Sequence, residues 1–183
     1  QENGLGMNPA VIFFGGRDIG QAKLDWAKEL GIMTILIDRD LNCAAAKKAD
    51  YHVVLSRDNI NDIVARCRRI SEENSVQLIG LYCGIDNGPV PALVAQALNI
   101  DQSSPDVYAI CSDKITMKQI FFDASVPTPR FLTSQSFGEL SQFYRSSGGV
   151  VIVKPASSSG SRGVEKVTTM DAFVGPIHVA KKH

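Results

Sequence analysis

The stretch AVIFFGGRDIG (residues 10–20) decides the fold of this chain. Its first five residues are continuously apolar and run into Gly15, a pattern typical of a strand buried on both faces. Ile19, Ala22 and Trp26 follow at helical spacing, so a helix is predicted directly after the glycines. A buried strand, a glycine turn and an amphipathic helix together predict the opening unit of a parallel α/β sheet.

The same alternation continues through the first half of the chain. Strands are predicted over MTILID (33–38), HVVL (52–55) and VQLIGLYC (76–83), and helices over residues 60–70 and VPALVAQALNI (90–100). This β-α-β-β-α-β-α order predicts a doubly wound parallel sheet with helices on both faces. The fold class of this half is therefore α/β.

The second half has a different pattern and starts at SSPDVYAI (103–110), which is predicted to be a connector because it contains serines and a proline. A helix is predicted over residues 112–125 with Ser112 as its N-cap, ended by VPTP (126–129) because each proline forces the preceding residue into extended geometry. RFLT (130–133) is a candidate short strand, and Ser136 with Glu139 forms a capping box before another helix. GVVIVKP (149–155) and VEKVT (164–168) are predicted strands, and a last helix is expected toward His183.

Composition indicates an ordinary globular protein and excludes some partners. Of the 183 residues, 44% are hydrophobic and 21% charged, and 19 basic side chains balance 19 acidic ones. Neither nucleic acid nor an anionic membrane is favoured by that balance. The four separated cysteines lack metal-ligand spacing, so we expect reduced thiols in a cytoplasmic protein and no metal site.

The first glycine loop, GGRDIG (15–20), allows three interpretations. A dinucleotide fingerprint needs glycine where Arg17 stands, although Asp38 ends the next strand where a ribose-binding acid is often found. Alternatively, Gly15, Gly16 and Gly20 shape a tight strand-to-helix turn whose N–H groups face a small anionic ligand. The third interpretation is a purely structural turn.

The second glycine loop lies in VIVKPASSSGSRGV (151–164). Lys154 precedes the loop rather than ending it, and a second β-type run follows, so the pattern predicts a hairpin and not a common P-loop. Hairpin loops usually contain about two to five residues, so the longer tip here is compatible either with a phosphate-binding flap or with a plain surface loop.

SDKITMKQIFFDASVPTPRF (112–131) followed by VVIVKPASSSGSRGV (150–164) closely resembles the ATP-grasp superfamily of carboxylate–amine ligases. The large subunit of carbamoyl phosphate synthetase and the amino-acid ligases are the most similar members in style. The resemblance implies a Rossmann-like pre-ATP-grasp domain followed by the first part of an α+β ATP-grasp domain. It divides the chain into residues 1–9, disordered or tag-derived, a pre-ATP-grasp domain over 10–104, and a linker helix with an incomplete first ATP-grasp subdomain over 105–183.

The resemblance also implies the cofactors and the site residues. ATP phosphates would be contacted by Lys114, Lys154 and the flap, whose residues are Ser157, Ser158, Ser159, Gly160, Ser161, Arg162 and Gly163. Gly16, Arg17 and Asp18 would bind substrate. Magnesium would accompany ATP, with its ligands outside this chain.

The implied activity is the activation of a carboxylate as an acyl phosphate that an amine then attacks. We expect the chain to be an N-terminal part of such a ligase, inactive alone and able to self-associate into a homo-oligomer. Its partners would be small carboxylate and amine substrates. The alternative is a non-catalytic α/β module that binds a small anion or a partner protein.

Overall fold

The computed structural model describes residues 7–84, 88–158 and 160–173, with backbone alone for residues 18–21 and 171. The chain divides into two compact units, residues 1–108 (unit 1) and 109–183 (unit 2), which are described separately below. No helix of the described residues is long and apolar enough to cross a membrane.

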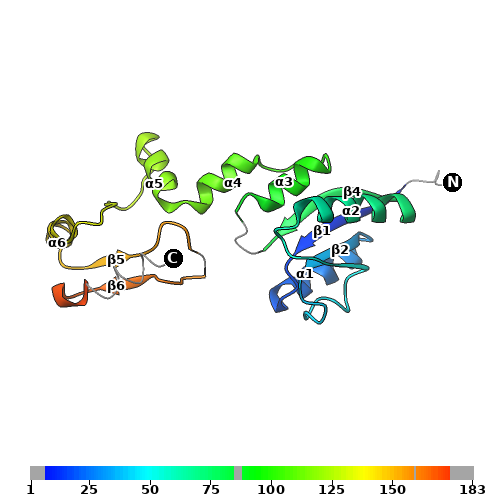
Figure 1. The fold of residues 1–183 in the computed structure, drawn as a ribbon, viewed down its shortest axis with the longest axis horizontal. Coiled ribbons are helices and arrows are strands. Elements are labelled where there is room, and N and C mark those ends of the chain that lie inside the picture. The colour runs from blue at the N-terminus through cyan, green and yellow to red at the C-terminus, as the bar shows by residue number, and fades with distance from the viewer. Residues whose placement is uncertain (1–6, 85–87, 159, 174–183) are drawn as a thin grey trace. The chain divides into compact units, whose positions relative to one another are not determined.

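Unit 1 is built on one four-stranded parallel sheet (Figure 1). Its strands are β1 (Asn8–Phe14), β2 (Met33–Asp38), β3 (Tyr51–Val54) and β4 (Val76–Cys83), in the order β3-β2-β1-β4. The register places Phe14 beside Ile37 on one side and beside Cys83 on the other. The carboxyl ends of β1, β2 and β4 therefore lie at one edge of the sheet, and the strand order changes direction between β1 and β4.

Helices cover both faces of this sheet, as predicted. On one face, Ile12, Ile35 and Ile37 pack in a cluster with side chains of α2 (Ile60–Asn74) and α3 (Val90–Ala97). On the other, Phe13 and Leu36 pack with Leu24 of α1 (Asp18–Glu29). Successive residues of one strand thus pack in the two clusters on opposite faces of the sheet, which is why the buried strands are continuously apolar.

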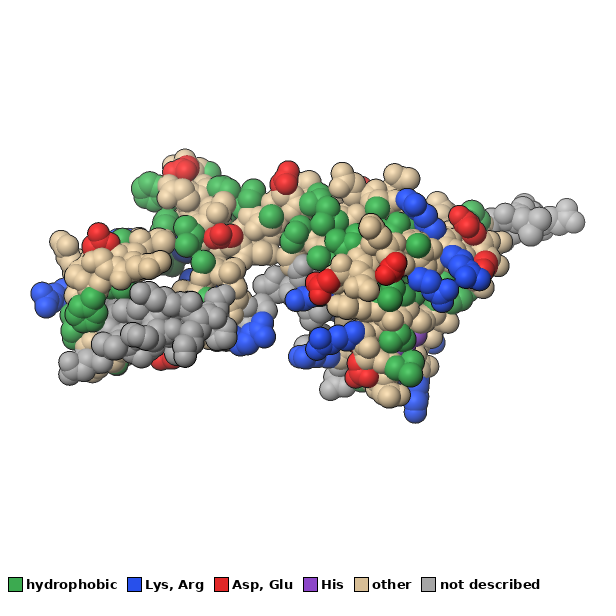
Figure 2. Space-filling model, in the orientation of Figure 1, with side chains coloured by type: hydrophobic (Ala, Val, Ile, Leu, Met, Phe, Trp, Pro, Cys, Tyr) green, Lys and Arg blue, Asp and Glu red, His purple; other side chains and the backbone are tan. Residues whose placement is uncertain are grey.

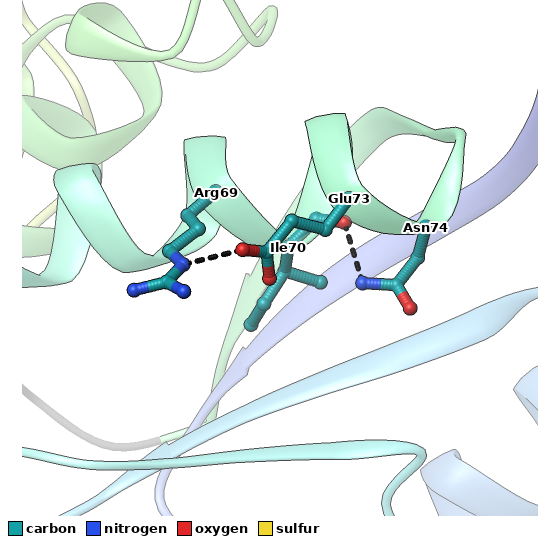
Figure 3. A network of polar contacts seen from close by, with 4 residues as sticks. All are labelled: Arg69, Ile70, Glu73 and Asn74. Carbon is teal, nitrogen blue, oxygen red and sulfur yellow. Dashed lines mark hydrogen bonds and ion pairs between the residues drawn. The ribbon is translucent and has the colours of Figure 1, made fainter.

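Helix α2 buries one apolar face and exposes a charged one. Four of its buried side chains are apolar or thiol (Ile63, Val64, Cys67 and Ile70), whereas Arg69 donates to Glu73 one turn later at 2.6 Å (Figure 3). The side-chain amide of Asn74 donates to the carbonyl oxygen of Ile70 at 3.0 Å near the end of the helix. On the face shown in Figure 2, acidic and basic side chains are interspersed over unit 1.

Helix α4 (Pro105–Ser112) begins in unit 1 and ends in unit 2. Unit 2 contains α5 (Lys114–Asp123), α6 (Phe137–Ser146), the antiparallel pair β5 (Val151–Val153) and β6 (Glu165–Val167), and the 3-10 turn Met170–Phe173. Of the described residues in this unit, few are buried; Pro155 and Val167 are the largest.

Three local predictions for this half were wrong. Residues 105–112 form α4 instead of a connector, and Asp113 rather than Ser112 caps α5, accepting hydrogen bonds from the N–H groups of Ile115 and Thr116. RFLT (130–133) is not a strand. The predicted helix N-cap at Ser136 is confirmed, because its hydroxyl accepts from the N–H of Glu139. Most of the last predicted helix lies outside the described residues.

Candidate functional site

The first glycine loop is tied to the end of β2. Gly15 donates its N–H to the carbonyl oxygen of Ile37 at 3.0 Å, and Gly16 donates to Asp38 Oδ2 at 2.6 Å. A methyl group on Gly16 would lie 2.2 Å from the sulfur of Cys43, far inside contact distance. Glycine is therefore required at position 16 by packing.

The carboxylate of Asp38 accepts hydrogen bonds from the backbone at the first glycine loop and after β2. While its Oδ2 accepts from Gly16, its Oδ1 accepts from the N–H of Asp40 at 2.8 Å. Both oxygens are engaged by the protein backbone. The carboxylate of Asp38, the candidate ribose-binding acid, thus accepts hydrogen bonds from the protein backbone, which weakens the dinucleotide interpretation.

A cavity of about 150 Å³ opens beside the loop, at the carboxyl ends of β1 and β4. Its apolar wall includes Phe13, Leu24 and Leu36, and its cations are Arg17 and Lys23. Ligands of open α/β sheets bind at this position, where the strand order reverses.

The rim of the cavity is polar. The exposed Arg17 is the N-cap of α1. The ammonium of Lys23 donates to the hydroxyl of Tyr82 and lies 4.0 Å from the centre of its ring. Of the three predicted substrate-binding residues, Arg17 lines the cavity, whereas Gly16 belongs to the loop but is not among the lining residues; the side chain of Asp18 is outside the described part of the structure.

In unit 2, the start of α5 is joined to the second glycine loop. The backbone N–H of Lys114 donates to the carbonyl oxygen of Ala156 at 3.0 Å. Its ammonium donates to the carbonyl oxygen of Ser158 at 2.6 Å and lies 3.5 Å from that of Ala156. Two predicted site segments more than forty residues apart, Lys114 and the loop after Lys154, are therefore brought together.

Lys154 directly follows β5 and precedes the buried Pro155. The pKa of its ammonium is lowered, first by partial burial and then by the positive charges of Lys118 and Lys114. The lysines are connected to the loop in different ways, since Lys154 precedes it and Lys114 contacts the carbonyl oxygens of Ala156 and Ser158. Across the described residues of unit 2, no carboxylate lies within ion-pair distance of Lys114, Lys118 or Lys154.

Lys118 is a further lysine of α5 that the sequence analysis did not single out. It lies one helical turn after Lys114 on α5, and its ammonium donates to the hydroxyl of Thr128 and lies 3.4 Å from the carbonyl oxygen of Pro129. The signal was its spacing, since residues four apart on a helix share a face.

The loop itself joins β5 to β6 in a strained conformation. Gly160, Ser161 and Gly163 all have positive φ, of 62°, 58° and 69°. Ser161 is the unusual member, because a residue with a Cβ rarely adopts this region. The side chains of Ser157 and Arg162 are exposed, whereas Ser159 lies outside the described residues.

The described residues hold no group of three or more His, Cys, Asp or Glu side chains placed to bind a metal. The groups that unit 2 presents around the second glycine loop include ammonium groups, hydroxyls and backbone groups. This donor set suits a polyanion such as a polyphosphate, since lysine contacts phosphate as a point charge.

Comparison of sequences finds relatives over about half of the chain. The chain is 32% identical over 104 residues to a D-alanine–D-alanine ligase of Sodalis glossinidius, covering 54% of this chain and 28% of that protein. It is 31% identical over 90 residues to the D-alanine–D-alanine ligase of Acidovorax ebreus, covering 48% and 27%. The matches thus span little more than a quarter of these relatives. No protein-family model matches the chain.

Solved structures share the fold over nearly the whole chain. N5-carboxyaminoimidazole synthetase from Staphylococcus aureus, complexed with ADP, gives a TM-score of 0.75 at 15% identity over 98% of this chain and 47% of that one. The biotin carboxylase domain of Hydrogenobacter thermophilus 2-oxoglutarate carboxylase, crystallised with MgADP, ADP and bicarbonate, gives 0.72 at 20% identity over 96% and 41%. An L-amino acid ligase from Bacillus licheniformis gives 0.72 at 16% identity over 94% and 42%.

The parallel sheet, the hairpin with its lysine and these shared folds define an ATP-grasp architecture. The sequence relatives found over about half of the chain are D-alanine–D-alanine ligases, which are carboxylate–amine ligases of the ATP-grasp type. The resemblance and the fold class predicted from the sequence are confirmed.

Proposed function

We propose that unit 2 binds the phosphates of ATP and that the chain is the N-terminal part of an ATP-dependent ligase. The ligase would activate a carboxylate as an acyl phosphate and join it to an amine, and this chain alone would be inactive. One observation carries the proposal: the ammonium of Lys114 reaches the carbonyl oxygen of Ser158, in the loop that follows Lys154.

The roles follow from charge. Phosphoryl transfer depends on positioning and on neutralising negative charge more than on covalent chemistry from the protein. Lys154 supplies a positive charge at the start of the segment Lys154–Ser158, and Lys114 supplies another where its ammonium contacts Ser158. No carboxylate of the described residues of unit 2 forms an ion pair with either lysine. We propose that the loop residues Ser157, Ser158, Ser159, Gly160, Ser161, Arg162 and Gly163 complete the phosphate site with hydroxyl, backbone N–H and guanidinium donors.

Magnesium would accompany ATP in this function. Support comes from the structural neighbour crystallised with MgADP. When bound, the ion would neutralise phosphate charge. The described residues offer it no cluster of ligands, so we propose that its ligands lie outside this set and assign no step to it.

Unit 1 would bind the small-molecule substrate. We propose that Gly16, Arg17 and Asp18 surround it, with Gly16 shaping the loop and Arg17 meeting the carboxylate. The cavity at the carboxyl ends of β1 and β4, which has cations at its rim and an apolar wall, supports this assignment. The substrates would be small carboxylates and amines, and the location would be the cytoplasm.

Self-association is proposed for unit 2. Phe122, Phe137 and Ile152 are 66%, 51% and 56% exposed, which is high for large apolar side chains. A homo-oligomer that covers them would sediment above the mass of the monomer, and Ile152→Lys would lower that mass. A clean monomer at high concentration would contradict this proposal.

Calorimetry with Mg-ATP tests the phosphate site. We expect weak binding by the chain and loss of that binding in Lys154→Met. Lys166→Met is the matched control, because Lys166 is an exposed lysine on β6 whose removal changes the net charge equally. Equal binding by the wild type, Lys154→Met and Lys166→Met would contradict the proposal.

The cavity of unit 1 supports one alternative, a non-catalytic module that binds a small anion. In that case a small carboxylate such as acetate or pyruvate would bind the chain, Arg17→Gln would abolish the binding, and ATP would not bind. The same calorimetric series therefore separates the ligase from the module.

A further inference from the structure

The N–H groups of Gly15 and Gly16 in the first glycine loop are already used by the protein. Gly15 donates to the carbonyl oxygen of Ile37 at 3.0 Å, and Gly16 donates to Asp38 Oδ2 at 2.6 Å. A ligand that took either donor would leave a protein acceptor without its hydrogen bond. Recognition of an anion at the adjacent cavity therefore depends on the side chains that line the cavity.

Arg17 and Lys23 are the charged side chains among the residues that line this cavity. Neither forms an ion pair with a carboxylate that the structure describes. Two described acids, on α1 and at the loop, have other partners, because Asp25 pairs with Lys48 at 2.6 Å and Asp38 accepts from backbone N–H groups. The cavity thus holds two positive charges that no described carboxylate neutralises.

Tyr82 holds the ammonium of Lys23 at the cavity. The ammonium donates to the hydroxyl of Tyr82 and lies 4.0 Å from the centre of its ring. That ring is tilted against the ring of Phe13, with 5.8 Å between the ring centres, and both rings line the cavity. An ammonium has three N–H donors, and the bond to the hydroxyl uses one of them, so donors remain for a ligand.

The volume and the wall of the cavity limit the ligand that it can take. The volume is about 150 Å³, and Phe13, Leu24 and Leu36 belong to the apolar wall. An apolar cavity of about this volume accepts benzene, so a ligand of about six to eight non-hydrogen atoms fits when its charged ends lie at the rim. A short methylene chain suits the apolar wall, and terminal carboxylates suit the two cations.

We propose that the cavity of unit 1 binds a short dicarboxylate such as succinate, with Arg17 and Lys23 each meeting one carboxylate. The inference rests on the proposed function, in which this cavity is the substrate site, and it narrows the substrate from a small carboxylate to a dianion. A monocarboxylate leaves one cation without a partner, and a zwitterionic amino acid brings an ammonium next to two positive charges. Charge therefore selects the dicarboxylate, and Lys23 determines the selection.

Succinate and butyrate test this selection, because they have carbon chains of the same length and differ by one carboxylate. At about pH 8 both carboxylates of succinate are ionised. Each ligand is titrated into the whole chain, and the backbone amide NMR signals of residues 13–17 and 82–84 report binding at the cavity rather than at the lysines of unit 2. We expect the wild type to bind succinate about tenfold more tightly than butyrate.

Lys23→Met should remove this preference. The variant should bind succinate about tenfold more weakly and butyrate within about twofold of the wild type, because Arg17 still meets one carboxylate. Lys23→Arg keeps the positive charge and should restore most of the preference. The matched control is Lys28→Met, which removes an exposed lysine from the last turn of the same helix and should retain the preference of the wild type.

Tyr82→Phe tests how Lys23 is held, and it serves if Lys23→Met does not fold. It keeps the aromatic ring and removes the hydroxyl, so the preference for succinate should fall by a smaller factor than in Lys23→Met. In Lys23→Met the second substitution should change the preference no further, because the ammonium that the hydroxyl holds is absent.

Two results would overturn the inference in different ways. If the wild type shows no preference, or if Lys23→Met matches Lys28→Met in its preference, Lys23 does not select a dicarboxylate, while the cavity remains a site for small carboxylates. If neither ligand shifts the cavity signals, the cavity is not the substrate site, and the proposed function of unit 1 fails together with the inference. The Mg-ATP titration of the unit 2 site is independent of both results.

Discussion

The ammonium of Lys114 and the carbonyl oxygen of Ser158 are 2.6 Å apart, so the side chain that begins α5 is bonded to the backbone of the second glycine loop. A second bond, from the N–H of Lys114 to Ala156, joins the same two segments. The residues that the sequence assigned to phosphate therefore restrain one another through the protein's own backbone.

Replacing Lys114 by methionine should release the loop on one side. We expect faster amide hydrogen exchange within residues 156–158, because the side-chain bond to Ser158 is lost while the backbone bond to Ala156 remains. Exchange measured by mass spectrometry checks this. Lys166→Met is the control, and equal exchange in the two variants would show that the Lys114 bond does not restrain the loop.

Gly16→Ala should destabilise unit 1. The new methyl group would lie 2.2 Å from the sulfur of Cys43, and overpacking of this kind typically costs about 1–3 kcal/mol. Urea unfolding measures the loss, and Gly16→Ala combined with Cys43→Gly should regain part of it. Gly138→Ala, on α6, has its nearest neighbour at 3.7 Å and should be neutral or stabilising.

Cys67 should make stability fall at alkaline pH. Burial raises the pKa of its thiol to about 12 from 9.0, and Arg66 lowers it by a lesser amount. Because the pKa is higher in the folded state, the contribution of the thiol to stability is complete below pH 9 and is lost as the pH rises toward 12.

The free energy of unfolding should therefore decrease above pH 9 by up to about 1.4 kcal/mol per pH unit on account of this thiol. Chemical denaturation of the wild type and of Cys67→Ala at a series of pH values gives the free energy of unfolding of each as a function of pH. The difference between the two slopes is the contribution of the Cys67 thiol. Equal slopes would contradict this contribution.

In the native protein the exposed Cys111 should react with iodoacetamide well before the buried Cys67.

Asp113→Ala should destabilise α5. The carboxylate of Asp113 accepts from the N–H groups of Ile115 and Thr116 at 2.8 and 3.1 Å, and loss of an N-cap costs about 0.5–2 kcal/mol. Thermal unfolding checks the cost. Asp113→Asn keeps a capping oxygen and should retain most of the stability, so equal losses in the two variants would contradict the capping role.

The sheet of unit 1 could be predicted almost to the residue. MTILID and VQLIGLYC are β2 and β4 as predicted, because a strand buried on both faces leaves an uninterrupted apolar run. Helix α4 was missed although its sequence carries a start signal, Ser104 followed by Pro105 and Asp106. Its apolar residues give no clear face, since none of its side chains is buried.

Motif order identified Lys114 and Lys154 in unit 2, and both lie at one loop, because Lys154 precedes it and Lys114 contacts the carbonyl oxygens of Ala156 and Ser158. Lys118 was not identified although it lies four residues after Lys114, because the motif that carried the prediction contains only the Asp-Lys pair at the start of the helix. The prediction of a strand at RFLT (130–133) was wrong, because strand formation depends on a pairing partner that these four residues do not specify.

The bond between Lys114 and Ser158 makes ligand binding an exchange reaction. An anion that takes the place of the Ser158 carbonyl oxygen, now 2.6 Å from the ammonium of Lys114, gains only the difference between the two contacts. Ligands with a weak or isolated charge gain little from that exchange. The Lys114 contact therefore raises the charge that a ligand must carry in order to compete for this hydrogen bond.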